Sequence, residues 1–169
     1  AATAYLVYKV ARRHVNESVS FMLSAFYLFN PAVLTDSALW GQVDSVFTLF
    51  LVLMVLLVTE KKMIPAYFIF ALAVFIKPQA FMFTPILIFG IVEHVFLNDY
   101  SREKFLKNLL YGLLAIACMF LLSLPFGIDL VIEQYVDTLQ SYPYLTINAF
   151  NLWGALGQNW TELNLLTSV

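Results

Sequence analysis

Long apolar stretches alternate with short polar clusters along most of the chain. A helix crosses the hydrocarbon core of a membrane with about 20 apolar residues, and several of the stretches approach that length. We therefore predict membrane-spanning segments over residues 1–10, 15–33, 43–59, 63–77, 80–97 and 106–125. The pattern predicts an all-α fold: a polytopic transmembrane helical bundle in which residues 1–169 form a single transmembrane domain segment.

The pattern changes after Pro125. Between residues 128 and 140, apolar positions recur every three or four residues, and Asp129, Glu133 and Asp137 lie on the other side. We predict an extracytoplasmic helix that lies along the membrane interface, although a solvated helix in an external loop has the same pattern. A further helix is expected to start near residue 151. Because the chain begins and ends within apolar runs, we expect it to be a fragment of a larger membrane protein.

Composition supports the membrane class. The 169 residues are 62% hydrophobic and 12% charged, whereas a soluble domain is about 45–50% apolar and about a quarter charged. The mean hydropathy is +0.82. A net charge of −2 leaves no basic stripe for nucleic acid, and the single cysteine allows no disulfide within the chain. These features exclude a soluble enzyme, a disordered segment and a nucleic-acid-binding protein, and they predict membrane lipids as partners.

Basic residues predict the orientation in the membrane. Residues 9–13, 61–62 and 102–107 hold eight of the nine lysines and arginines, and two predicted spans separate each cluster from the next. Lysine and arginine in short loops stay in the cytoplasm, so all three clusters are predicted to be cytoplasmic. The other polar segments then face the extracytoplasmic side. The membrane would be the plasma membrane of a prokaryote or the endoplasmic reticulum membrane of a eukaryote.

Lys77 interrupts an otherwise apolar hairpin, next to the helix-breaking Pro78 and close to Gln79. An ionisable residue at membrane depth normally has a partner or a ligand, and a lysine ammonium suits phosphate. The alternative is that Lys77 only extends its ammonium to the lipid headgroups.

A second polar stretch contains Asp36, Trp40, Gln42 and Asp44. An indole ring stacks on the apolar face of a sugar, and carboxylate and amide groups bind its hydroxyls, so carbohydrate is the ligand that we predict. Either aspartate could instead cap a helix or interact with its dipole.

Three segments carry a family resemblance: the stretch from Asn30-Pro31 through Trp40-Gly41-Gln42-Val43-Asp44-Ser45, then Ile76-Lys77-Pro78-Gln79, and then Asn148-Ala149-Phe150-Asn151-Leu152-Trp153. They resemble the polytopic GT-C glycosyltransferases, most closely the microbial mannosyltransferases related to the enzyme that adds the second mannose of the GPI anchor. The resemblance implies an enzyme that moves a sugar, with mannose favoured, from a polyprenyl- or dolichyl-phosphate donor. The acceptor would be a glycan, a lipid or a protein on the extracytoplasmic face.

The resemblance also implies which residues bind substrate. These are Lys77, Gln79, Trp40, Gln42, Asp44, Asp36, Asn148 and Asn151. The catalytic acid of that family lies in an earlier external loop, so no catalytic residue is assigned in this chain, and part of the active site is expected outside it. No cofactor is specified, and a divalent metal ion is left open.

Two other functions fit the same pattern. Broken helices and an intramembrane lysine also occur in secondary transporters and in flippases for lipid-linked substrates. The chain could also be a noncatalytic membrane subunit whose external loops bind a partner protein.

Overall fold

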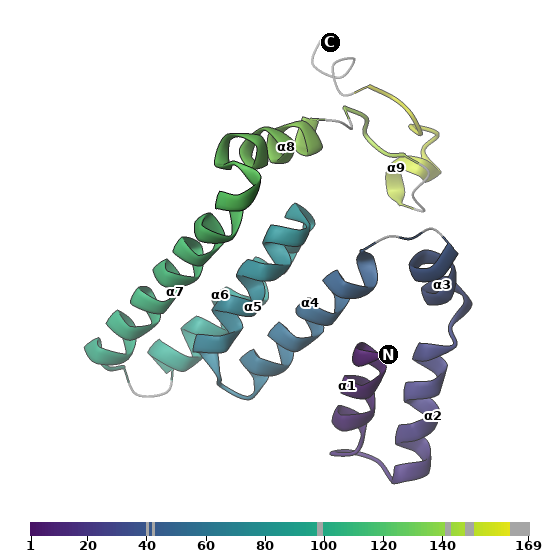
Figure 1. Ribbon diagram of the computed structural model, residues 1–169. Helices are drawn as coiled ribbons and strands as arrows, with labels where there is room; N and C mark the ends of the chain where they lie inside the picture. The colour runs from purple at the N-terminus through teal and green to yellow at the C-terminus, as the bar shows by residue number, and fades with distance from the viewer. Residues whose placement is uncertain (40, 42, 98–99, 141–142, 148–150, 163–169) are drawn as a thin grey trace. The chain divides into compact units, whose positions relative to one another are not determined.

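The computed structural model describes residues 1–169 except 40, 42, 98–99, 141–142, 148–150 and 163–169. Within these residues the chain is helical and has no strand, and an isolated β-bridge joins Tyr144 to Glu162. The predicted all-α class is therefore confirmed. The chain divides into two compact units, Ala1–Leu122 and Ser123–Val169, which are described separately (Figure 1).

The first unit contains most of the helices. In chain order they are α1 (Ala2–Ala11), α2 (Glu17–Leu28), α3 (Pro31–Leu34), the π-helical turn η1 (Thr35–Leu39), α4 (Asp44–Thr59), α5 (Met63–Ile76), the 3-10 helix η2 (Pro78–Phe83), α6 (Thr84–Val92), the π-helical turn η3 (Glu93–Leu97) and α7 (Arg102–Ser123), which leads into the second unit. The second unit contains η4 (Leu124–Phe126), α8 (Ile128–Gln140) and α9 (Leu152–Ala155).

Two helical segments of the described chain are long and apolar enough to cross a membrane, Pro78–Leu97 and Arg102–Phe126. A third candidate is the pair Glu17–Leu28 and Pro31–Leu39, which is bent by 46°. Pro31 begins the second arm of this pair, and the Asn30 side chain accepts a hydrogen bond from the Ala32 amide at 2.9 Å. Asparagine before a proline is a strong helix start, which explains why the bend occurs there. The apolar α4 and α5 are shorter than a full span.

The core of the first unit lies between α4, α5, α6 and α7. It contains Met54, Val58, Met63, Ala66, Tyr67, Ala71, Leu87 and Ala115. Helices α4 and α5 form an antiparallel pair (Figure 1), and fully buried alanines on α5 (Ala66 and Ala73) allow the close approach that is common between membrane helices. Helix α6 packs against α4 at Gly90, where an added Cβ would lie 2.5 Å from Val58 Cγ1.

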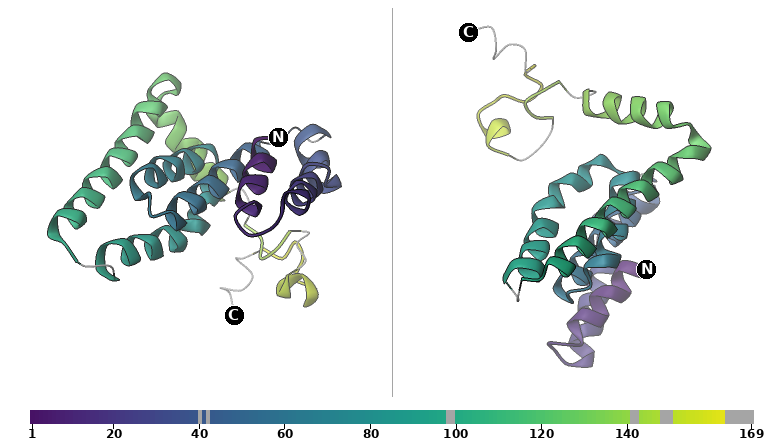
Figure 2. Two further views of the ribbon diagram at one scale, coloured as in Figure 1. Left: turned by 90° about the horizontal axis from the view of Figure 1, so that it is seen from below. Right: turned by 90° about the vertical axis from the view of Figure 1, so that its left-hand side faces the viewer.

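Helices α1 and α2 form a second antiparallel hairpin in this unit (Figure 1, Figure 2). The Ser24 hydroxyl donates a hydrogen bond to the Ala4 carbonyl at 2.7 Å, which links the two helices. Many large apolar side chains of α7 are exposed, including Leu113 at 57% and Leu121 at 65%. Exposed apolar side chains along a span are what contact with lipid requires.

Candidate functional site

The polar stretch after α2 folds into α3 and η1 and then enters α4. Asp36 lies in η1 and is half-buried. Asp44 is the first residue of α4, where the helix dipole favours a negative charge, and Val43 rather than Asp44 is the N-cap residue. The predicted site residues Trp40 and Gln42 lie outside the described residues.

Lys77 and Asp44 form an ion pair between the end of α5 and the start of α4. The backbone of Lys77 is extended (φ −145°, ψ 123°), as expected for a residue before proline, and this ends α5. The two side chains are 26% and 35% exposed, so the pair is partly shielded from water. The structure thus brings together two residues that lie 33 positions apart in the sequence.

Two serines lie in the same region, and the sequence did not predict a contact between them. The hydroxyls of Ser37 and Ser45 are hydrogen-bonded to each other, and Ser37 also donates to the Val33 carbonyl at 2.6 Å. This contact holds η1 against the first turn of α4. Serine is common at helix ends, so the sequence alone carried no signal that these two would meet.

Gln79 lies in η2, two residues after Lys77, and its side chain is exposed. We call Asp36, Asp44, Lys77 and Gln79 the polar cluster. The ion pair joins Asp44 to Lys77, while Asp36 and Gln79 belong to the neighbouring elements η1 and η2 at the end that the sequence predicts to be extracytoplasmic.

Asn151 belongs to the second unit, and its side chain supports the local fold. Its Oδ1 accepts a hydrogen bond from the Gly154 amide at 2.9 Å and caps α9. Its Nδ2 donates to the Thr146 hydroxyl at 3.0 Å. The Tyr144 and Trp160 rings pack edge to face, 5.4 Å apart, beside this loop. Asn148, the other predicted asparagine, lies outside the described residues.

Acidic residues, histidines and cysteine form no group of three or more that could hold a metal ion within the described parts of the chain.

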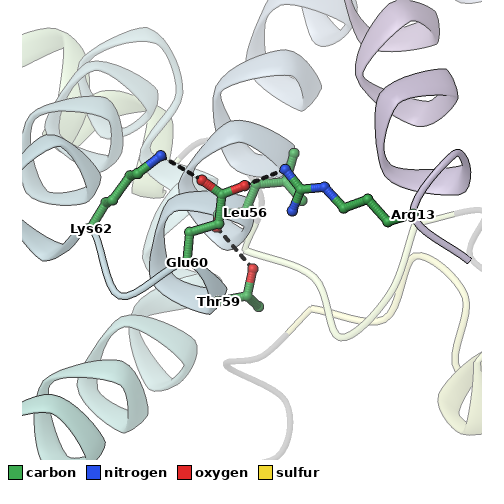
Figure 3. Close-up of polar contacts among 5 residues, drawn as sticks. All are labelled: Arg13, Leu56, Thr59, Glu60 and Lys62. Carbon is green, nitrogen blue, oxygen red and sulfur yellow. Dashed lines mark hydrogen bonds and ion pairs between the residues drawn. The ribbon is translucent and has the colours of Figure 1, made fainter.

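A second group of charged side chains lies at the opposite end of the first unit. The Glu60 carboxylate, at the end of α4, accepts a hydrogen bond from the Lys62 ammonium at 2.7 Å and another from the Arg13 guanidinium (Figure 3). The bond from Lys62, followed by that from Arg13, lowers the pKa of Glu60 from 4.5 to about 2. This ion pair links the turn after α1 to the turn after α4.

The apolar helices and the polar groups at their ends define an integral membrane protein, and comparison with known families identifies which kind. The chain belongs to the family of the GPI transamidase subunit PIG-U, which matches residues 2–146. No individual curated protein and no solved structure shows significant similarity to the chain.

The family corrects the functional prediction. The resemblance to mannosyltransferases pointed to GPI-anchor biology, and the family does act there, but as a transamidase subunit. The predicted glycosyltransferase activity is therefore wrong, and the lipid-phosphate sugar donor has no support. The short motifs describe how helices end at a membrane surface among polar groups. They do not determine which bond is made or broken, and for that reason they misled the prediction.

Proposed function

We propose that the chain is a noncatalytic membrane subunit of a GPI transamidase in the endoplasmic reticulum membrane of a eukaryotic cell. The observation that carries this proposal is the family match over residues 2–146, and the apolar helices of the first unit support it. The partners would be the other subunits of the complex and membrane lipids. This is the subunit alternative of the sequence analysis, and the chemistry of transamidation would belong to a partner chain.

We further propose that the polar cluster binds the headgroup of the GPI lipid. Such a lipid keeps its acyl chains in the bilayer and presents phosphate and sugar hydroxyls at the interface. The Lys77 ammonium would contact phosphate as a compact cation. Asp36 and Gln79 offer oxygen acceptors for hydroxyls, and Gln79 also offers an amide donor.

The ion pair with Asp44 holds the Lys77 ammonium in position before an anionic ligand binds. A lysine alone at membrane depth is unfavourable, and Asp44 compensates its charge before the lipid arrives. A lipid phosphate would then compete with Asp44 for the ammonium. Asp44 would then interact with the dipole at the N-terminus of α4, since it lies in the first turn of that helix.

The test uses the full-length protein expressed in cells that lack their own copy of this subunit. Lys77→Met removes the charge, Lys77→Arg keeps it, and both are compared with wild type. We expect Lys77→Met to lower the amount of a GPI-anchored reporter at the cell surface about tenfold, since a hydrogen bond to a charged group contributes about 1.5–3 kcal/mol. Lys77→Arg should retain most of the reporter signal.

Co-purification of the other transamidase subunits distinguishes the two parts of the proposal. If Lys77→Met lowers the reporter while the complex stays intact, the polar cluster acts on the lipid. If the reporter is unchanged, the lipid role is refuted. If the complex dissociates, the cluster instead contacts a partner protein. Failure of the wild-type chain to co-purify with a transamidase would refute the subunit assignment itself.

A further inference from the structure

A pocket of about 190 Å³ opens at the end of the first unit that the sequence predicts to be cytoplasmic. Residues from the turn after α4, the first turn of α5, the start of η3 and the start of α7 line it, and Figure 1 shows the turn between α4 and α5 and the start of α7 at this end. Its lining includes Lys61, Lys62, His94, Lys104 and Lys107. We call this cavity the basic pocket. It lies at the other end of the α4–α5 pair from the polar cluster and plays no part in the function proposed above.

The lining of the basic pocket is cationic. Four lysines contribute to it, and no carboxylate does so among the described residues. Within the described part of the chain, two carboxylates compensate part of this charge: Glu93 lies 3.6 Å from the Lys61 ammonium, and Glu60 pairs with Lys62. Glu60 is shared with Arg13, so its charge is divided between two cations. The balance around the pocket therefore remains positive and favours an anionic ligand.

The floor of the pocket is apolar. Met63 is buried at 3% exposure, and the half-buried Ile64 lies beside it in the first turn of α5. The side chains of Lys61 and Lys62 are 56% and 60% exposed, as expected when methylene stems cover an apolar surface and the ammonium groups reach water. An apolar floor with a cationic rim suits an amphiphile better than a fully hydrated ion.

Large apolar side chains on the elements that line the pocket are exposed. Phe96, Leu97 and Leu106, on the two elements that contribute His94 and Lys104, are 49%, 68% and 50% exposed. Acyl chains could lie against these side chains while a headgroup occupies the basic pocket. A soluble anion would make no use of this surface.

One wall of the pocket is held in place by hydrogen bonds. Asn108, which also lines the cavity, accepts a hydrogen bond from the Tyr67 hydroxyl at 2.6 Å and donates one to the Lys104 carbonyl at 2.8 Å. These bonds fix the first turns of α7 against α5. Lys104 and Lys107 are three residues apart and so share one face of α7.

The backbone at Lys61 supports a role for its side chain. Lys61 has a φ of 59°, the left-handed conformation in which glycine is the usual residue. The Lys61 and Lys62 amides bond to the Val58 and Leu57 carbonyls at 2.9 and 2.8 Å, which is the helix-ending arrangement that normally has glycine at this position. A lysine at this position is unfavourable for the backbone, but its side chain places an ammonium group at the pocket.

We propose that the basic pocket binds the phosphorylated headgroup of an anionic phospholipid from the cytoplasmic leaflet. Basic pockets between membrane helices on the cytoplasmic side bind such headgroups in other proteins. The lysines and the apolar residues that line this cavity match that chemistry. Binding here would fix the depth of α5 and α7 in the membrane.

The test measures lipid binding to the purified full-length protein in phosphatidylcholine nanodiscs, with phosphatidylinositol 4-phosphate as the probe. The test variant is Lys104→Gln with Lys107→Gln. Its control is Lys9→Gln with Arg12→Gln, which removes two positive charges from the same predicted face outside the pocket. Each lysine near an anionic lipid contributes about fivefold in affinity, so we expect the test variant to bind tenfold or more weakly and the control to change less than twofold.

The remaining outcomes each contradict the proposal. Equal losses in both variants would show a diffuse surface attraction instead of a pocket. Wild-type protein that does not prefer the probe over phosphatidylcholine would refute lipid binding. Inorganic phosphate or inositol phosphate that displaces the lipid at equal concentration would identify a soluble anion as the ligand.

Circular dichroism of each variant verifies that the helices are retained. Lys107→Gln alone, at an exposed position, should give an intermediate loss of lipid binding.

Discussion

Ion pairs mark both ends of the α4–α5 hairpin, and each end includes a pair of residues that are distant in the sequence. Asp44 with Lys77 fixes one end, and Glu60 with Arg13 and Lys62 fixes the other. The first pair is partly shielded from water and the second lies at the surface. The contributions of these pairs to the free energy of unfolding should therefore differ in their sensitivity to salt, since salt screens exposed pairs more strongly.

The lowered pKa of Glu60 predicts a pH-dependent contribution to stability. An acid whose folded-state pKa is depressed stabilises the fold above its ordinary pKa and loses that contribution as the pH falls through the folded value. For Glu60 this window runs from pH 4.5 down to about 2. Glu60→Gln should therefore lower the Tm at neutral pH and match wild type near pH 2.

Thermal unfolding of the detergent-solubilised protein between pH 7 and pH 2 checks this prediction. Glu133→Gln is the matched control, because Glu133 is an exposed acid on α8. A Glu60→Gln curve that runs parallel to the wild-type curve over the whole range would show that the Glu60 ion pairs do not stabilise the fold.

At the scale of elements, the turn between α4 and α5 depends on an unfavourable backbone conformation. Lys61 adopts φ 59°, and a residue with a Cβ loses about 1 kcal/mol in that region relative to glycine. The free energy of unfolding of Lys61→Gly should therefore be about 1 kcal/mol higher than that of Lys61→Ala. Both variants lack the Lys61 side chain, and only alanine keeps the backbone strain. Chemical denaturation of the two variants measures this difference, and equal stabilities would contradict it. Lys61→Gly should still bind the anionic lipid more weakly than wild type does.

The contact between α6 and α4 depends on Gly90. A Cβ at this position would lie 2.5 Å from Val58 Cγ1 and 3.4 Å from Met63 Cε, both in the buried core. Gly90→Ala should destabilise the protein by about 1–3 kcal/mol through overpacking. Adding Val58→Ala removes the obstructing methyl groups, so the double variant should be more stable than the sum of the single effects predicts.

Gly112→Ala is the control for this helix contact. Nothing lies within 4 Å of a Cβ added at Gly112, which is inside α7. Alanine there should be neutral or stabilising by up to about 1 kcal/mol, because alanine favours the helix over glycine. Equal destabilisation by both substitutions would indicate that the loss at Gly90 does not arise from contact with α4.

At the scale of the whole molecule, the fold class could be predicted because apolar run length is a local property. The break at Asn30-Pro31 also follows from local chemistry, since the asparagine caps and the proline begins a helix. The charge rule predicted that Asp44 and Lys77 lie at the same end of the helices, but their direct ion pair and the basic pocket could not be predicted, because both depend on how separate helices pack. The same limit explains the error in function: the motifs predict polar groups near the ends of apolar segments, and such groups do not by themselves distinguish a sugar transferase from a noncatalytic membrane subunit.

Membrane orientation is the last prediction, and both proposals depend on it. The basic clusters place the turn before α7 in the cytoplasm, and a single crossing by α7 then places α8 on the opposite side. Cys118 is the only cysteine of the 169 residues, so Cys118→Ser removes the background labelling of this segment. In that background Ser101→Cys should react with a membrane-impermeant maleimide as soon as the plasma membrane is permeabilised and the reagent reaches the cytoplasm. Asp137→Cys, at an exposed position of α8, should react only when the lumenal side is open. Labelling of both cysteines from one side would mean that α7 does not cross the membrane. The polar cluster and the basic pocket could then no longer be assigned to the lumenal and cytoplasmic leaflets by the charge rule.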